Sequence, residues 1–498
     1  MTAHLPALIV ISPLAIALLL PVLVRLSAEL VRVVAITSAL ISFTSSIGAL
    51  KYALAKGNWH YFFGGWPAPW GIEYVIDPLA GGMAVLVSFF SLLVIIYAGP
   101  YLVNKPAREK GYFYTLYLLL TAGLLGIVVT GDVFNLYVFL EISSLAAYAL
   151  IASGGHRATV AAFRYLLIGT AAASFYLLGI GYLYAITGSL NMADLSELLP
   201  PLMDSRAVVI AVALIVIGLG IKMALFPLHG WLPDAYSYAP APVIGFIAAV
   251  MAKVSAYALY RVLYFVLKAT GPVSLALDVM GWMAAAGILF GSIMAILQRD
   301  FWRMLAYSSV AQMCYIALGI SLANTMGLFG ALLHILNHAV TKGCLFLVAG
   351  SVNWQTGVRE IHRFVKMSRR MPLTMGAFII AALSMIGLPP TAGFFSKWYL
   401  VLGAIQSGAW AFVIVLALSS LLTAVYFFRI IEHAYFKEPL KGKDGQRHAT
   451  EPAKEGWELY PTMLVPILIL GIGILALGIL SEQVITHLLQ FALPWRAF

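Results

Sequence analysis

Long apolar segments recur along the whole chain and are separated by short polar connections. Most segments are long enough to cross a bilayer, which takes about 20 apolar residues in a helix. The apolar runs and the turn residues between them predict about fourteen transmembrane helices. We expect these helices at 6–24, 31–54, 78–99, 112–130, 132–152, 161–187, 207–227, 243–267, 273–297, 303–321, 325–352, 372–402, 408–433 and 460–481.

Two of the predicted helices contain turn-forming sequence. The seventh runs into Phe226-Pro-Leu-His-Gly-Trp-Leu-Pro-Asp234, and the twelfth contains Gly387-Leu-Pro-Pro-Thr-Ala-Gly393. Interruptions five helices apart are expected of an inverted repeat, and such repeats place ion sites at the broken helices. The predicted fold is therefore an all-α polytopic membrane protein with two inverted five-helix repeats, helices 4–8 and 9–13, in which helices 7 and 12 are broken.

This scheme divides the chain into four parts. Residues 1–111 hold the first three helices and an aromatic, turn-rich hairpin at about 55–77 that we place outside the membrane. Residues 112–268 hold the first repeat and residues 269–433 the second. Residues 434–498 hold a hydrophilic loop, which is too polar to form a core of its own, and the last helix.

Composition supports a membrane protein. Hydrophobic residues make up 62% of the chain and charged residues only 10%, whereas soluble domains carry about 25% charged residues. The net charge of +10 would suggest a nucleic-acid partner for a soluble chain. Here it is better explained by topology, so we expect no nucleic acid.

The basic residues indicate an orientation, because cytoplasmic loops of membrane proteins collect lysine and arginine. With the N-terminus outside, nineteen basic residues fall in inside loops, including Lys441, Lys443, Arg447 and Lys454. Five fall outside, with Arg496 among them. Both termini are thus predicted outside a cell membrane. The first cation follows the first apolar run, so that run is expected to be a retained helix, not a cleaved signal peptide.

The sequence predicts no cofactor. Cys314 and Cys344 are the only cysteines, and both lie inside apolar segments, so neither a disulfide framework nor a metal-cluster motif is available. The Gly471-Ile-Gly473 run lies in continuous apolar sequence and is interpreted as a helix-packing motif, not as part of a nucleotide site.

Four lysines lie well inside predicted helices: Lys222, Lys253, Lys342 and Lys397. Intramembrane charges are costly and usually mark ion or proton routes, so we interpret all four as functional. Lys253 has no counter-ion nearby in the sequence and is expected to be partly neutral, hence able to accept a proton. Lys397 follows the interruption in the twelfth helix.

Glu141, in the fifth predicted helix, is the natural partner of Lys222. Burial disfavours a charged lysine, whereas a nearby carboxylate favours it. At an effective dielectric near 20, an ion pair that separates from about 4 to 8 Å loses roughly 2 kcal/mol. A change in spacing can therefore switch Lys222 between holding and releasing a proton. The alternative is a static ion pair that ties two helices together.

His334, His338 and Lys342 are spaced four residues apart. At about 100° per residue they share one helix face over about 12 Å, which suits a hydrated proton relay. Two alternatives stay open: histidines satisfied by packing, and a metal site, for which no third ligand is near.

The break in the seventh helix carries His229 and Asp234, which are candidates for a proton entry from the inside. A turn or capping role explains Asp234 equally well. Asp132 is expected to cap the fifth helix, and Arg164 and Arg303 are interpreted as loop-face charges.

Several long motifs resemble one family. They are the run from Gly131 to Glu141, the run from Phe226 to Ala235 with Ala239-Pro-Ala-Pro242, and the runs Leu336–Lys342 and Leu345–Gly350. They are similar to the antiporter-like proton-channel subunits shared by respiratory complex I, membrane-bound hydrogenases and Mrp-type cation/proton antiporters. The resemblance covers nearly the whole chain.

The resemblance implies a hydrated half-channel in each repeat, joined along the membrane plane. It implies that Glu141 and Lys222 form a switching pair and that Lys253 is a connecting lysine. It also implies that the face of His334, His338 and Lys342 is the central relay, with Lys397 as the terminal residue.

Within the family, the segment from Thr187 to Leu195 and the surroundings of Lys253 look most like the D-type subunit of Mrp antiporters. The expected function is therefore proton translocation within a multisubunit Na⁺/H⁺ antiporter, with other membrane subunits as partners. The first alternative is a redox-driven pump of the complex I or hydrogenase type. The second is a structural membrane scaffold with static ion pairs.

Overall fold

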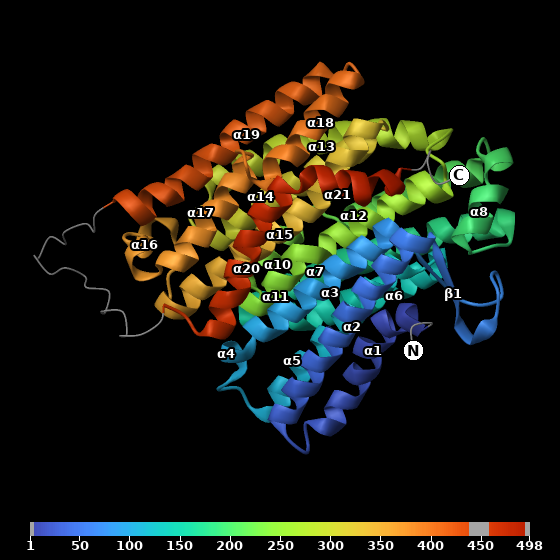
Figure 1. The fold of residues 1–498 in the computed structure, drawn as a ribbon. Helices are drawn as coiled ribbons and strands as arrows, with labels where there is room; N and C mark the ends of the chain where they lie inside the picture. The colour runs from blue at the N-terminus through green and yellow to red at the C-terminus, as the bar shows by residue number, and fades with distance from the viewer. Residues whose placement is uncertain (1–3, 438–457, 494–498) are drawn as a thin grey trace, which may run out of the picture.

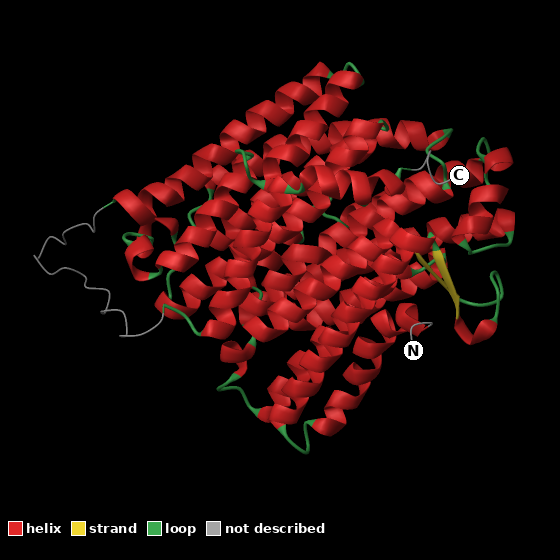
Figure 2. Ribbon diagram, in the orientation of Figure 1, coloured by secondary structure: helices red, strands yellow, loops and turns green. Residues whose placement is uncertain are grey.

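The computed structural model describes residues 4–437 and 458–493. Within this part of the chain almost every residue is helical, apart from short connections and one small hairpin (Figure 2). The predictions made for Lys441, Lys443, Arg447 and Lys454 in the last loop, and for Arg496, lie outside the described residues.

In the described ranges, twelve helical segments are long and apolar enough to cross a membrane. Each begins and ends within a few residues of a predicted helix, which confirms the all-α polytopic fold. They are α1 (Leu5–Leu23), α2 (Ala28–Lys56), α3 (Pro78–Tyr97), α5 (Ala107–Val129), α6 (Val133–Ala152), α7 (His156–Thr187), Ala241–Val266, α13 (Pro272–Leu297), α14 (Phe301–Ser321), α15 (Thr325–Thr356), Trp410–Phe436 and α20 (Pro461–Ile479).

Two of these segments contain π-helical turns, which the apolar pattern does not reveal. The first is built from α11 (Ala241–Phe246), the π-turn η4 (Ile247–Met251), α12 (Ala252–Arg261) and the π-turn η5 (Val262–Val266). The second joins α19 (Trp410–Ile431) to the π-turn η7 (Glu432–Phe436). Such turns are rare and frequently lie at functional sites.

Both predicted interruptions are present. The seventh predicted helix ends at Lys222, five residues before the predicted end, and the chain continues into a short helix; the twelfth is split between Ile386 and Ala392. Pro227 disfavours helical backbone at the residue before it, and Ala224 has a positive φ of 60°. The four pieces are α9 (Arg206–Lys222), α10 (Leu232–Tyr238), α17 (Pro372–Ile386) and α18 (Ala392–Gln406). The count of fourteen crossings, the inverted repeats and the four-part division stay predictions.

Short elements fill the connections. Strands β1 (Trp59–Phe62) and β2 (Glu73–Ile76) pair antiparallel, which confirms the predicted hairpin. The others are η2 (Phe63–Gly65), α4 (Gly99–Leu102), α8 (Met192–Leu198), η3 (Pro200–Leu202), η6 (Ile361–Arg363), α16 (Met367–Arg370), α21 (Ser481–His487) and η8 (Leu489–Ala492).

The helices form an elongated bundle with α1 and α2 at one edge and α18 and α19 at the opposite edge (Figure 1). Helix α15 packs against α11, α14, α17, α18 and α20, so it joins the two halves of the chain. The most apolar stretch of Ala241–Val266 is wholly buried and that of α15 is 94% buried, against 28% for Trp410–Phe436. Together with α14, whose most apolar stretch is also 94% buried, these two segments form the core of the bundle.

A buried carboxylate ties the hairpin to the bundle. Glu73 on β2 is hydrogen-bonded to His60 on β1 and accepts a 2.9 Å bond from Asn191, the N-cap of α8. The hydrogen bond to Glu73 raises the pKa of His60. Burial acts to raise the pKa of Glu73, but the bonds from His60 and Asn191 outweigh it, so the pKa is lowered.

These shifts predict a pH window for hairpin stability. The contribution of Glu73 is present above its ordinary pKa of 4.5 and is lost as pH falls through its lowered pKa. The contribution of His60 is present below its ordinary pKa of 6.5 and is lost as pH rises through its raised pKa. Protection of the β1 and β2 amides from hydrogen exchange, corrected for the pH dependence of exchange in an unstructured peptide, should be greatest between these limits. In Glu73→Gln the window should disappear, and an unchanged pH profile would contradict the assignment.

Candidate functional site

Glu141 and Lys222 meet where the seventh predicted helix breaks. Lys222 is the last residue of α9 and is 2% exposed, while Glu141 on α6 is 25% exposed. The Lys222 Nζ lies 3.9 Å from Glu141 Oε1 and donates a 2.7 Å hydrogen bond to the Ser144 hydroxyl, one turn along α6. The Glu141 Oε1 has no hydrogen-bond partner among the described residues. Lys222 therefore has two acceptors and is bonded to the neutral one.

Lys253 is buried in the first turn of α12, directly after the π-turn η4. Its Nζ donates to the carbonyl of Ala248, which lies inside that π-turn. None of the ion pairs between described residues includes Lys253. The amine is thus held by backbone alone in the fully buried central segment.

The histidine face of α15 is buried, and its two imidazoles stack. The rings of His334 and His338 are 5.7 Å apart and nearly parallel, at 10°. His334 Nδ1 lies 2.9 Å from the Ser396 hydroxyl, and Nε2 lies 2.9 Å from Gln312 Oε1. Both nitrogens of His338 lack a hydrogen-bond partner within the described chain. The predicted common face is therefore present, with one histidine anchored and the other not.

Lys342 continues this face and is fully buried. Its Nζ donates to the carbonyl of Leu305 at 2.8 Å and to the hydroxyl of Ser308, both on α14. The ring of Phe346 lies 5.9 Å from the amine.

Lys397 lies on α18, and its amine reaches back across the helix break. Its Nζ donates to the carbonyls of Met385 and Ile386, at 2.8 and 3.1 Å, at the C-terminal end of α17. A cation is stabilised there because free carbonyls give a helix C-terminus a partial negative charge. The same amine lies 5.2 Å from the ring of Tyr315, which stacks on His334 at 5.6 Å.

The π-turn η4, which directly precedes α12, packs against α15, so Lys253 lies near enough to interact electrostatically with the α15 face. The charge of Lys253 acts on His334, His338 and Lys342, and the charge of Lys397 acts on His334. Lys222 and Glu141 form a separate pair, in the first half of the chain.

The two candidates for proton entry, His229 and Asp234, lie in the segment that follows α9. The ring of His229 packs against those of Phe226 and Phe290, at 5.4 and 5.0 Å, and these two rings also contact each other. The buried Nδ1 of His229 has no described partner. Asp234 on α10 is bonded to Arg164 at 2.9 Å and lies 3.5 Å from Arg303. The two arginines interpreted as loop-face charges therefore hold α10 to α7 and α14. The predicted cap is confirmed: Asp132 accepts from the amide of Asn135.

Sequence reasoning missed the polar groups that hold the basic ones, chiefly Ser144, Gln312 and Ser396. Two signals were available: Ser144 follows Glu141 by three residues, which share a helix face, and Ser396 directly precedes Lys397. The bond from Lys253 to Ala248 depends on a π-turn that no residue pattern announces.

The helical membrane topology, with basic side chains buried in its interior, is the architecture of the antiporter-like membrane subunits. The chain belongs to the family described as NADH:quinone oxidoreductase/Mrp antiporter, TM, which matches residues 130–423.

Relatives come from two kinds of assembly. The chain is 65% identical over its full length, and over the full length of the relative, to NADH-quinone oxidoreductase subunit N of Desulforudis audaxviator (strain MP104C). It is 30% identical to the D-type subunit of the Na(+)/H(+) antiporter of Bacillus subtilis (strain 168), over 86% of this chain and 87% of the relative. These identities favour the redox-driven alternative over the Mrp D-type expected from the sequence.

Solved structures give the same family. A chain of the membrane-bound sulfane sulfur reductase, an archaeal respiratory membrane complex, matches with a TM-score of 0.88 and 31% identity, over 97% of this chain and 96% of that one. A chain of the Mrp complex from Dietzia sp. matches at 0.86 and 25%, over 98% and 96%. A chain of respiratory complex I from Thermus thermophilus matches at 0.75 and 25%, over 97% and 98%.

Substitutions of the two stacked histidines should have unequal effects on stability. His334→Phe removes the partner of the buried Gln312 oxygen, which should cost about 1–3 kcal/mol. His338→Phe removes no protein hydrogen bond and should leave stability within about 0.5 kcal/mol of the parent or raise it. Thermal unfolding of the purified protein in detergent checks the pair. Equal destabilisation by both variants would contradict the described anchoring.

Proposed function

We propose that this chain is a proton-pumping subunit of a redox-driven membrane complex of the quinone-reducing type. Support comes from its full-length identity of 65% to an NADH-quinone oxidoreductase subunit, compared with 30% to an antiporter subunit. Proton carriage is supported by one observation above all, the buried row of amines and imidazoles between α12 and α18.

The switching element is Lys222 with its two acceptors. When Lys222 is bonded to Ser144, the amine is held by a neutral oxygen and releases its proton more readily than when it is paired with Glu141. The 3.9 Å spacing between Nζ and Glu141 Oε1 is about 1 Å longer than a charge-assisted hydrogen bond. A side-chain rotation therefore suffices to exchange one acceptor for the other.

The proton then moves from Lys222 to Lys253, onto the α15 face and on to Lys397. Water carries the transfers, because buried polar groups without protein partners need water. The two nitrogens of His338 are such groups, and so is the Glu141 oxygen. His229 and Asp234 lie at the break that leads toward Lys222, so we retain them as the entry.

The hairpin end faces outside in this proposal. His4, before α1, is bonded to Tyr61 on β1, which places the start of α1 beside the hairpin. Arg164, Arg303 and Arg359 form ion pairs at the opposite ends of the helices, on or beside the other set of connections, as the positive-inside rule expects of the cytoplasmic side. The partners are other membrane subunits, and we assign the redox centres to partner subunits.

The second candidate is the proton-carrying D-type subunit of an Mrp-type Na⁺/H⁺ antiporter, located in a cell membrane. The match to the Mrp complex, with a TM-score of 0.86, favours it. The same residues would carry protons, but inward proton movement would drive Na⁺ export through a partner subunit or a shared interface, and no electron transfer would be coupled to it.

Glu141→Gln and Lys222→Ala should each reduce quinone-dependent acidification of inside-out membrane vesicles by at least about tenfold, because each removes one half of the switch. Internal pH is followed with a fluorescent dye, and the assembled complex is quantified in the same membranes. Ala146→Gly on α6 is the control and should retain pumping.

Three outcomes separate the candidates. Loss of quinone-dependent pumping in the two variants supports the proposal. Loss of a NaCl-induced pH change, with no quinone-dependent pumping in the parent, supports the antiporter. Normal transport in both variants, with the complex fully assembled, contradicts both transport functions and favours the structural membrane scaffold.

Ser144 and Ser143 provide a matched pair on α6. Ser144→Ala removes the alternative acceptor of Lys222 and should slow pumping by about tenfold, the scale set by one hydrogen bond to a charged group. Ser143 donates instead to the Leu140 carbonyl of its own helix, so Ser143→Ala should retain more than about half of the rate. Equal rates in the two variants would contradict the switch.

A further inference from the structure

Helix α12 carries a polar line that begins at the relay residue Lys253 and continues beyond the relay. Lys253, Tyr257 and Arg261 are spaced four residues apart on this helix. They therefore share one face and extend over about 12 Å from Lys253. Arg261 is the last residue of α12 and lies against the start of α3, next to the hairpin. The line leads from the buried relay to the hairpin end of the molecule.

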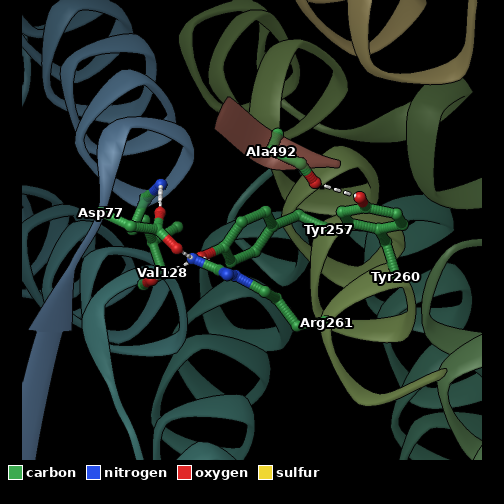
Figure 3. A network of polar contacts seen from close by, with 7 residues as sticks. Asp77, Val128, Tyr257, Tyr260, Arg261 and Ala492 are labelled. Atoms are coloured by element: carbon green, nitrogen blue, oxygen red, sulfur yellow. Dashed lines mark hydrogen bonds and ion pairs between the residues drawn. The ribbon is translucent and has the colours of Figure 1, made fainter. Parts of the chain in front are cut away.

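Arg261 is fixed from several sides (Figure 3). Its Nη2 is paired with the Asp77 carboxylate, and its Nε donates a 2.9 Å hydrogen bond to the Tyr257 hydroxyl. The guanidinium lies over the rings of Tyr257 and Phe265, at 5.3 and 4.7 Å. Asp77 is itself fixed, since it caps α3 through the amide of Ala80. The charge therefore has little freedom to move.

A cavity reaches this point from the hairpin side. Its volume is about 100 Å³, and its lining includes Val75 of the hairpin, Thr130, Met192, Tyr257 and Arg261. That volume holds a few water molecules, and the hydroxyls and the guanidinium offer them hydrogen bonds. One helical turn of α12 separates the Tyr257 position from Lys253.

The hydrogen bonds at this turn do not direct a proton toward Lys253. The Tyr257 hydroxyl donates to the carbonyl of Val128 at 2.9 Å and accepts from Arg261 (Figure 3). Its proton is therefore directed at a backbone oxygen. Arginine keeps its charge at any physiological pH and has no site that accepts a proton. Its charge also cancels the attraction that the Asp77 carboxylate would exert on a proton in the cavity.

We propose that Arg261, held by Asp77 and Tyr257, is a barrier residue that stops protons on the hairpin side from reaching Lys253. The inference rests on the proposed function, in which Lys253 carries protons and the hairpin faces the proton-rich side. Without such a barrier, protons would return through the cavity to the relay, and the gradient that the complex builds would decay.

Passive proton flux tests the barrier. The assembled complex is reconstituted into vesicles without an electron donor, an acid step is applied, and internal pH is followed with a trapped dye. Arg261→Gln should raise the rate of internal acidification by about tenfold, the effect of one charge at about 12 Å and an effective dielectric near 20. Arg261→Lys keeps the charge and should stay close to the parent.

A double variant separates a specific path from damaged packing. Lys253→Ala in the Arg261→Gln background should return the flux to the parent level, because the leak must pass through Lys253. Arg429→Gln is the control, since Arg429 is likewise a half-buried arginine near the end of a helix, bonded to backbone carbonyls at the end of α13, but it does not line the cavity. It should not leak.

The outcomes are distinct from those for the pump. The barrier is overturned if Arg261→Gln does not raise the passive proton flux, or if the raised flux persists after Lys253→Ala. Either result overturns it even if Glu141 and Lys222 prove essential for pumping. A leak that depends on Lys253 supports the barrier even if the complex turns out to be a Na⁺/H⁺ antiporter.

Discussion

A charged amine in the hydrocarbon core costs several kcal/mol unless a partner or water compensates it. This chain places four such amines in its interior, and among the described residues only Lys222 has a carboxylate within 4 Å. The other three are held by carbonyl and hydroxyl oxygens. Neutral acceptors stabilise a charged amine less than a carboxylate does. The charged and neutral forms are thereby kept closer in free energy, as a group that gains and loses protons requires.

The helix breaks follow from the same constraint. Ending α9 at Lys222 and α17 at Ile386 frees backbone carbonyls inside the bundle, and the amine of Lys397 uses two of them. The second break is tight: a Cβ on Gly393 would lie 1.8 Å from the Ser384 carbonyl oxygen, so only glycine fits there. Irregular backbone at membrane depth is tolerated where protein or a water-filled space surrounds it.

Most of the fold could be predicted from the sequence, because apolar runs of bilayer length have few alternative structures. The relay residues could also be predicted, because an intramembrane lysine or glutamate is conspicuous in apolar sequence. Their partners could not. Ser144 and Gln312 are ordinary residues in helices, and the carbonyl of Ala248 becomes available through a π-turn. The proposed role of Arg261 could not be predicted either, because it depends on the cavity beside this residue.

The central claim is that water joins the buried basic groups into one path. A structure of the assembled complex at a resolution that shows ordered water tests it most directly. We predict hydrogen-bonded water from Lys222 to Lys253, around both nitrogens of His338 and on to Lys397, with a gap between Lys253 and Arg261. Dry apolar packing between Lys222, Lys253 and the α15 face would contradict the account.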